Sequence, residues 1–129
     1  MPNAIINQGV ISSDLPGQTL TIRGAQFVNT GAVEVHAGST LTMASGAWSG
    51  SGSVLVDGGT LNPGGAFVSS AVAGLSGSGG TVNLTGRMNN TGSTYTLDGA
   101  ANSWNVIATT GSPSEFPRLI GGVLNLTNG

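Results

Sequence analysis

The segment Ser39-Thr40-Leu41-Thr42-Met43 decides the fold, because variants of it recur along the chain at nearly constant spacing. The variants begin at residues 18, 39, 59, 80, 102 and 122, so the successive steps are 21, 20, 21, 22 and 20 residues. A fixed period in this range is typical of stacked repeat architectures. Within each variant polar and apolar residues alternate, which predicts a strand with one buried face.

Two further apolar positions recur between these segments. A second alternating stretch, Val33–His36, is matched by Val54–Asp57 and later by Tyr95–Asp98. A large apolar residue follows the recurring segment in four successive units, and these residues are Phe27, Trp48, Phe67 and Met88. Each unit therefore predicts three short strands separated by glycine-rich corners, where glycine reaches positive φ without steric cost.

A unit of this length buries its apolar face only when it is stacked on copies of itself. We therefore predict a parallel β-solenoid (β-helix) with about six coils of 20–22 residues and three short strands per coil. Equivalent residues would form inner columns about 4.8 Å apart. The two columns expected from the recurring segment are Leu20, Leu41, Leu61, Val82, Trp104 and Leu124, and Ile22, Met43, Pro63, Leu84, Val106 and Leu126. A two-sheet β-sandwich is the competing fold, although it does not require constant spacing.

Three irregular places interrupt the repeat. Residues 66–80 lose the clean alternation, and Val72 and Leu75 are the candidates for the second-strand position there. Residues 109–117 are rich in turn-forming residues and predict a protruding loop. Pro63 cannot donate to a ladder, so we place it at the end of its strand. The length predicts a single domain over residues 1–129.

The composition excludes several classes of protein. Only 6% of the residues are charged, and the net charge is −2. The three arginines are not clustered, so we expect no nucleic-acid partner. No apolar run approaches the roughly 18 residues of a membrane span, so we expect no membrane insertion. The absence of cysteine excludes disulfides and thiolate metal sites.

The amino-acid sequences of the repeats also resemble those of a known family. The stretch Gly50–Gly65 (GSGSVLVDGGTLNPGG) and the stretch Val35–Met43 resemble the autotransporter-associated β-strand repeats and the filamentous-haemagglutinin-like β-helical exoproteins. The resemblance implies a right-handed β-helix that serves as a secreted or cell-surface stalk, in an adhesive or scaffold role, in bacteria. It brings no catalytic residues. A signal peptide, a translocator barrel and an end cap are not evident, so we interpret the chain as an excerpt of a longer repeat protein.

The outward residues of the recurring segment form the candidate binding surface. We expect a ladder of neutral hydrogen-bonding side chains on one flat face, comprising Thr19, Thr21, Thr40, Thr42, Thr60, Asn62, Thr81, Asn83, Ser103 and Asn105. Regular Thr-x-Thr arrays resemble those of some ice-binding solenoids, and such a face also suits a polysaccharide. The alternative is that threonine is simply a good outward strand residue and that stacked asparagines form side-chain ladders. The change from Thr to Asn after Leu61 spoils a uniform lattice.

Catalysis and metal binding find little support in the sequence. Asp57 and Asp98 occupy equivalent positions with one coil between them, so they lie about 10 Å apart, too far to share a calcium ion. His36 aligns with Asp57, but no motif supplies a nucleophile and an oxyanion site. We therefore predict no enzyme, cofactor or metal, and keep a fragment of a β-helical glycan-active enzyme as the weakest alternative. Trp48, Tyr95 and Trp104 fall at inward positions and are expected in the core.

The ends of a solenoid are unpaired strand edges, which invite pairing with another chain. No charged or amphipathic cap is evident at Gly122–Gly129. We therefore expect the chain to continue in its parent protein or to associate end to end with a second copy, and we also consider glycans and host surfaces as partners.

Overall fold

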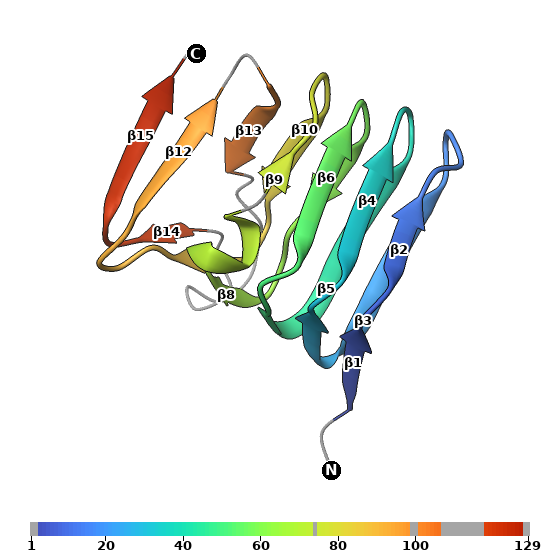
Figure 1. Cartoon of the computed structure of the whole chain (residues 1–129), viewed down its shortest axis with the longest axis horizontal. Helices are drawn as coiled ribbons and strands as arrows, with labels where there is room; N and C mark the ends of the chain where they lie inside the picture. The colour runs from blue at the N-terminus through green and yellow to red at the C-terminus, as the bar shows by residue number, and fades with distance from the viewer. Residues whose placement is uncertain (1–2, 74, 99–100, 107–117, 128–129) are drawn as a thin grey trace.

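The chain folds as a parallel β-solenoid whose turns are stacked along the long axis of the molecule (Figure 1). The computed structural model describes residues 3–73, 75–98, 101–106 and 118–127. These residues make about five turns, against the six that the repeat count predicted. The ladders between its strands are all parallel, which excludes the β-sandwich alternative and confirms the predicted fold class.

The recurring segment forms the first wall of the solenoid. Its strands are the first half of β3 (Thr19–Asn29), the first half of β5 (Thr40–Ser49), β7 (Thr60–Asn62), β10 (Thr81–Leu84) and β13 (Ser103–Val106). The register pairs Leu20, Leu41, Leu61, Val82 and Trp104 in succession, as the predicted column requires. Strand β7 ends immediately before Pro63, so this proline lies where the sequence placed it.

The other two walls complete each turn. The second wall contains β1 (Ala4–Asn7), the second halves of β3 and β5, β8 (Ala66–Val68), β11 (Arg87–Asn89) and β14 (Arg118–Ile120). The third wall contains β2 (Val10–Ser13), β4 (Ala32–His36), β6 (Ser53–Asp57), β9 (Leu75–Ser76), β12 (Thr94–Asp98) and β15 (Val123–Thr127). In β3 the chain passes from the first wall to the second at Gly24, whose φ of 151° favours glycine.

The sixth recurring segment does not belong to the first wall. Strand β15 pairs with β12, so Leu124 aligns with Tyr95 and Leu126 with Leu97 on the third wall. The prediction that these two leucines extend the first-wall columns is therefore wrong. The reason is that the last turn is longer than the others. Met88 pairs with Leu119, 31 residues later, whereas the usual spacing between paired residues is about 21. A segment of alternating polar and apolar residues can form a strand in any of the three walls. The extra residues between Met88 and Leu119 place the sixth recurring segment on the third wall. The loop predicted at 109–117 lies outside the described residues.

The core consists of the inward columns of the three walls. Aliphatic side chains from successive turns are almost completely buried, including Val33, Val35, Leu41, Val54, Val56, Leu61 and Val82. Along the second wall, the rings of Phe27, Trp48 and Phe67 follow one another with centroid separations of 6.4 and 5.1 Å. Each turn thus covers the apolar face of its neighbour, which is the burial that a single turn cannot achieve.

Buried asparagines hold the corner between the second and third walls. The side-chain amides of Asn7, Asn29 and Asn90 each donate to a backbone carbonyl at the start of the third-wall strand one turn further on. The acceptors are the carbonyl oxygens of Ala32 at 2.8 Å, Ser53 at 3.1 Å and Val123 at 2.9 Å. These bonds satisfy carbonyl groups that a tight corner would otherwise bury without a partner.

The third wall is divided into two sheets. Strand β9 pairs with β6 and strand β12 pairs with β15, but no ladder joins β9 to β12 in the part of the chain that the structure describes. The corner before β9 explains this division. Eight positions separate Phe67 from Leu75, whereas six separate Trp48 from the equivalent Val54. The surplus forms the 3-10 turn η1 (Ser69–Val72), which inserts Val72 into the core. Of the two predicted candidates, Leu75 therefore holds the second-strand position and Val72 does not.

Candidate functional site

The predicted outward ladder forms two straight rows on the first wall. One row comprises Thr19, Thr40, Thr60, Thr81 and Ser103, and the other comprises Thr21, Thr42, Asn62, Asn83 and Asn105. The strand register thus brings all ten predicted residues onto one face, with about 4.8 Å between successive members of a row. The face is neutral, because none of its side chains ionises near pH 7.

The asparagines of the second row are joined by side-chain hydrogen bonds. Asn105 donates to Asn83, Asn83 donates to Asn62, and Asn62 donates to the hydroxyl of Thr42, each over 3.1 Å. Each amide has two N–H groups and a carbonyl oxygen with two lone pairs. One N–H group and one lone pair of Asn83 are used within the row, so the remaining ones stay available to a ligand or to water. This row is therefore an ordered array of donors and acceptors.

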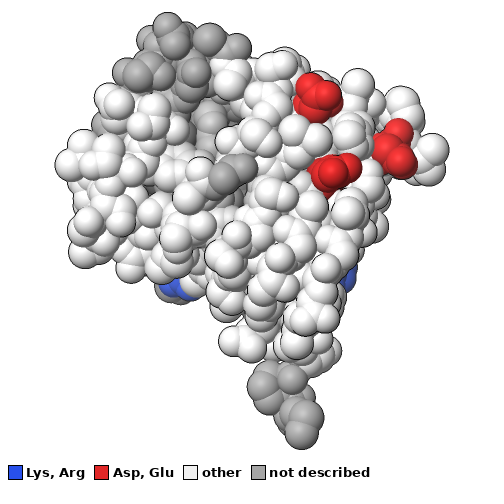
Figure 2. All heavy atoms as spheres, in the orientation of Figure 1, with Lys and Arg blue, Asp and Glu red and all other residues white. Residues whose placement is uncertain are grey.

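Two acidic residues lie on a different wall from the ladder. Glu34 lies on β4 and Asp57 on β6, and Figure 2 shows acidic groups over this part of the third wall. The predicted alignment of His36 with Asp57 is confirmed by the register, but the His36 ring contacts Glu34, with 3.1 Å between Nε2 and Oε2. Both side chains are about one-third exposed, so this pair contributes little to stability.

These charged groups form no metal-binding cluster in the part of the chain that the structure describes. Across the described residues, no three side chains of the His, Cys, Asp and Glu types lie close enough to hold a metal ion together. The side chain of Asp98 lies outside the described part. Its strand, β12, belongs to a different sheet from that of Asp57.

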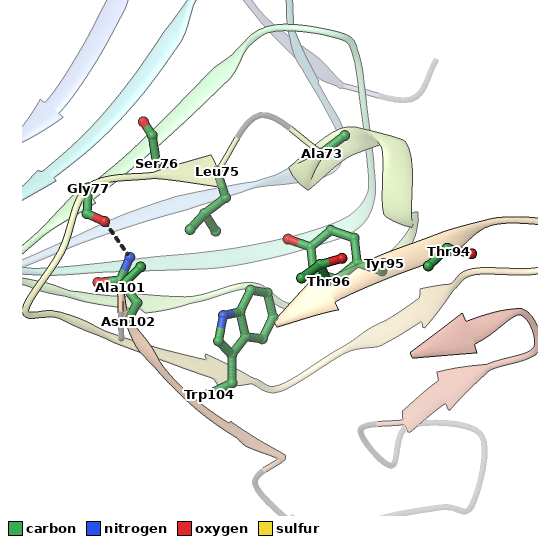
Figure 3. A pocket seen from close by; sticks show the side chains of 10 residues that line it. All are labelled: Ala73, Leu75, Ser76, Gly77, Thr94, Tyr95, Thr96, Ala101, Asn102 and Trp104. Atoms are coloured by element: carbon green, nitrogen blue, oxygen red, sulfur yellow. Dashed lines mark hydrogen bonds between the residues drawn. The ribbon is translucent and has the colours of Figure 1, made fainter. Parts of the chain in front are cut away.

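The division of the third wall opens a pocket into the interior of the solenoid. The pocket has a volume of about 390 Å³. Its lining comes from β9, β12, β13 and the adjoining corners, and comprises Ala73, Leu75, Ser76, Gly77, Thr94, Tyr95, Thr96, Ala101, Asn102 and Trp104. Figure 3 shows Leu75 and Trp104 pointing toward one another from β9 and β13, with Tyr95 on a third side. The pocket therefore reaches from the third wall toward the inner surface of the first.

Two aromatic residues, Tyr95 and Trp104, belong to the floor of this pocket, and both were predicted to point inward. Tyr95 is buried, and its hydroxyl donates to the backbone carbonyl of Val72 over 2.9 Å. Burial raises the pKa of the Tyr95 phenol above its ordinary value, because the apolar surroundings disfavour the charged form. Trp104 is only partly buried and meets Tyr95 edge to face, with 5.7 Å between the ring centroids. Trp104 thus offers aromatic surface to the pocket.

The amide of Asn102 makes two hydrogen bonds at the edge of the pocket. Its Oδ1 accepts from the backbone N–H of Gly80 over 2.8 Å, and its Nδ2 lies 3.4 Å from the carbonyl oxygen of Gly77. Asn102 therefore joins the corner between the third and first walls through backbone groups on both sides of its amide.

Sequence reasoning did not predict this pocket or the corner asparagines. The signal for the pocket was the two-residue surplus between Phe67 and Leu75, which we interpreted only as lost alternation. The signal for the corner residues was an asparagine two positions after some of the inward second-wall residues, as in Phe27-Val28-Asn29 and Met88-Asn89-Asn90, whereas Gly50 and Ser69 hold this position after Trp48 and Phe67. Polar residues at glycine-rich corners are normally solvated turn residues, and only the three-dimensional path buries these.

A smaller hollow, of about 370 Å³, lies on the second wall. It occurs where β5 and β8 share only the Ala47–Ala66 pair, so that the ladder opens beside Trp48 and Phe67. The indole N–H of Trp48 is buried and has no hydrogen-bond partner among the described residues. This wall is thus less regular than the first.

Comparisons with known proteins give no relative. No protein-family model matches the chain, and no curated protein or solved structure is significantly similar to it. Among the helices within the described ranges, none has the length and apolar character needed to cross a membrane.

Proposed function

We propose that this chain is a structural β-solenoid segment, a stalk or scaffold of a secreted or cell-surface bacterial protein. The observation that supports this proposal most directly is the unbroken first wall, in which five strands are paired in register from β3 to β13. A continuous ladder along the axis makes neighbouring turns into one body, as a rigid spacer requires.

The mechanical basis is the combination of ladders and inner columns. Backbone hydrogen bonds between turns run roughly along the axis, so opening a turn breaks the ladder bonds that join it to the next. Separating two turns also exposes the inner columns, as at Leu41 and Leu61, which are completely buried. Both costs grow with each turn that is opened.

The surface chemistry agrees with a passive or adhesive role outside the cell. Ser, Thr and Asn supply most of the polar residues, and Figure 2 shows few charged residues on the visible face. Together with the resemblance of Gly50–Gly65 to the repeats of β-helical exoproteins, this supports the assignment to a secreted or surface-exposed protein.

Single-molecule pulling tests the mechanical proposal. With handles attached at the two ends of the chain, we expect discrete force peaks as turns open in succession. Each turn of 21 residues releases about 70 Å of chain. Smooth extension without force peaks would contradict a mechanical role.

The exposed edges of the first turn support end-to-end association. Strand β1 pairs only with β3, and β2 only with β4, among the described residues. No turn covers the inner column at this end. Leu20 is 37% exposed, whereas Leu41, the next residue of the same column, is 0% exposed. At the other end β13, β14 and β15 each have one described partner. We propose that the last turn of one copy pairs with the first turn of the next, a head-to-tail contact that builds filaments.

A second candidate function is binding of ice or a polysaccharide by the ladder face. The specific observation is the alignment of Thr19, Thr40, Thr60 and Thr81 in one row of equal spacing. Thermal hysteresis tests ice binding, and a glycan array tests polysaccharide binding. In either assay, replacing Thr40 and Thr60 by bulky lysines should abolish the signal, and an unchanged signal would exclude this face.

A further inference from the structure

The pocket in the third wall differs in chemistry from the ladder face. Its described lining contains no carboxylate, ammonium, guanidinium or imidazole group. The one ionisable side chain is Tyr95, whose hydroxyl is already bound to the carbonyl of Val72. A charged ligand would lose its hydration here without gaining a partner of opposite charge, so the pocket suits a neutral one.

The lining is divided into an apolar floor and a polar mouth. Leu75, Tyr95 and Trp104 form the floor, and Trp104 retains accessible ring surface. The hydroxyl-bearing residues Thr94 and Thr96 are exposed and lie at the mouth. Ser76 is also exposed, but its side chain points away from Leu75 and Trp104 (Figure 3). A ligand that fits must therefore present an apolar face on one side and hydrogen-bonding groups around its edge.

The divided wall leaves one edge of β12 without a neighbouring strand among the described residues. The N–H group of Val123 donates to the carbonyl of Ser93 over 2.9 Å. This bond shows which residues of β12 direct their backbone groups toward β15. Alternate residues of a parallel strand direct their backbone groups to opposite neighbours. Thr94 and Thr96 therefore direct theirs toward β9, with which no ladder is formed among the described residues. These groups can serve as additional donors and acceptors for a ligand.

The two ends of the opening are closed, and this limits the shape of the ligand. At one corner the N–H of Gly79 donates to the carbonyl of Ala101 over 2.8 Å. At the other corner the Ser69 hydroxyl donates to Oδ1 of Asn90 over 2.7 Å. Turns joined so closely at both corners leave no room for a continuous polypeptide strand between β9 and β12. The space of about 390 Å³ is instead that of a compact ligand.

We propose that this pocket binds one neutral sugar ring, free or as a unit of a glycan. A pyranose has an apolar C–H face and a rim of hydroxyl groups, which matches the two parts of the lining. The C–H face lies on the Trp104 indole, and the hydroxyls bind Thr94, Thr96 and the backbone groups of β12 that face β9. The site does not depend on the proposed stalk function.

Trp104 allows binding to be followed directly. The chain contains two tryptophans, and Trp48 is only 2% exposed, so acrylamide quenching of the fluorescence reports mainly on Trp104. The probes are glucose, galactose, mannose and N-acetylglucosamine, their tetrasaccharides, and glucuronate and glucosamine as charged counterparts. We expect at least one neutral sugar to protect Trp104 saturably. Equal protection by its charged counterparts would overturn the proposal, as would no protection by any neutral sugar. Tighter binding of a tetrasaccharide than of its monosaccharide would identify the glycan as the source.

Two threonine variants distinguish the pocket from the ladder face. Thr96→Val keeps the shape of the side chain but removes a hydroxyl at the mouth, and should weaken binding about tenfold. Thr42→Val makes the same change on the first wall and should leave binding unchanged. The reverse result would place the sugar on the ladder face and overturn the pocket assignment. Calorimetry with Trp104→Leu should show loss of binding, and circular dichroism of each variant verifies the fold. Competition by an extended peptide of alternating residues would also overturn the proposal.

Discussion

The hydroxyl of Tyr95 lies 2.9 Å from the carbonyl oxygen of Val72 and donates to it across the division of the third wall. Val72 belongs to the two-residue surplus that opens the wall, and Tyr95 is the first inward residue beyond the opening. The bond thus satisfies a buried carbonyl that the surplus leaves outside any ladder. The two extra residues before β9 therefore create the pocket, and the η1 turn that they form also positions Tyr95 in its lining.

Alkaline pH should destabilise the protein through Tyr95. The folded state has the higher phenol pKa, so the stabilisation is complete below the unfolded value of about 10 and is lost as the pH rises further. The chain has one tyrosine, no lysine and no cysteine, so few other groups titrate in this range. Urea unfolding at a series of pH values should show stability falling above about pH 10.

The Tyr95→Phe variant is the control for this pH dependence. It should lose about 1–3 kcal/mol at neutral pH, because the Val72 carbonyl loses its partner, but its stability should no longer depend on phenol ionisation. Absorbance at 295 nm follows the single phenol directly. Formation of tyrosinate at the ordinary pKa in the folded protein would contradict the burial of Tyr95.

Corner asparagines should matter far more than those of the outer ladder. Asn29→Ala removes the buried amide that bonds to the Ser53 carbonyl and should cost about 1–3 kcal/mol. Asn83→Ala deletes the same side chain on the first wall, where water replaces its bonds, and should cost less than about 1 kcal/mol. Equilibrium unfolding in urea measures both variants, and equal losses would show that the corner bonds have no special role.

Glycine should be required where neighbouring turns approach most closely. A Cβ at Gly86 would collide with the backbone carbonyl of Gly65 one turn below, so Gly86→Ala should destabilise by more than about 2 kcal/mol. A Cβ at Gly9 would have no atom within 4 Å, so Gly9→Ala should be nearly neutral. Thermal unfolding compares the two, and a neutral Gly86→Ala variant would contradict the close stacking at that corner.

A charge at the first-turn edge should prevent end-to-end association. Sedimentation velocity over a range of concentrations should show larger species as the concentration rises. Leu20→Glu, at a 37% exposed edge position, should shift the distribution to monomer. Val68→Glu introduces the same charge at a 49% exposed side chain on the second wall and should have no effect. Concentration-independent monomer for the unchanged chain would contradict the proposed association.

A core truncation should cost more in the middle of the solenoid than at its exposed edge. Leu61→Ala removes a side chain that is 0% exposed and should cost about 2–5 kcal/mol. Leu20→Ala makes the same change in the same column at the uncovered turn, where water already reaches the side chain, and should cost clearly less. Chemical unfolding of both variants tests this gradient, and equal costs would contradict the continuous buried column.

The regular part of the molecule was predictable because each turn repeats the same local requirements. Alternating residues at a constant period dictated which side chains face inward, and constant spacing dictated which residues pair. The columns from Leu20 to Trp104 and the outer rows from Thr19 to Asn105 followed from that rule alone. Trp48 and Tyr95 were assigned to the core for the same reason and are buried.

The irregular parts required the tertiary structure, because a periodic pattern states only that a segment fits a wall and not which one. Leu124 and Leu126 carry the alternation of the first wall, yet the long step from Met88 to Leu119 places them on the third. Likewise, the surplus before Leu75 was visible in the spacing, but its effect depended on how neighbouring turns accommodate it. By itself the sequence determined a neutral solenoid with named columns and a flat polar face. Only the packing of one turn on the next decided where the wall divides, which asparagines are buried, and that Tyr95 and Trp104 face a pocket.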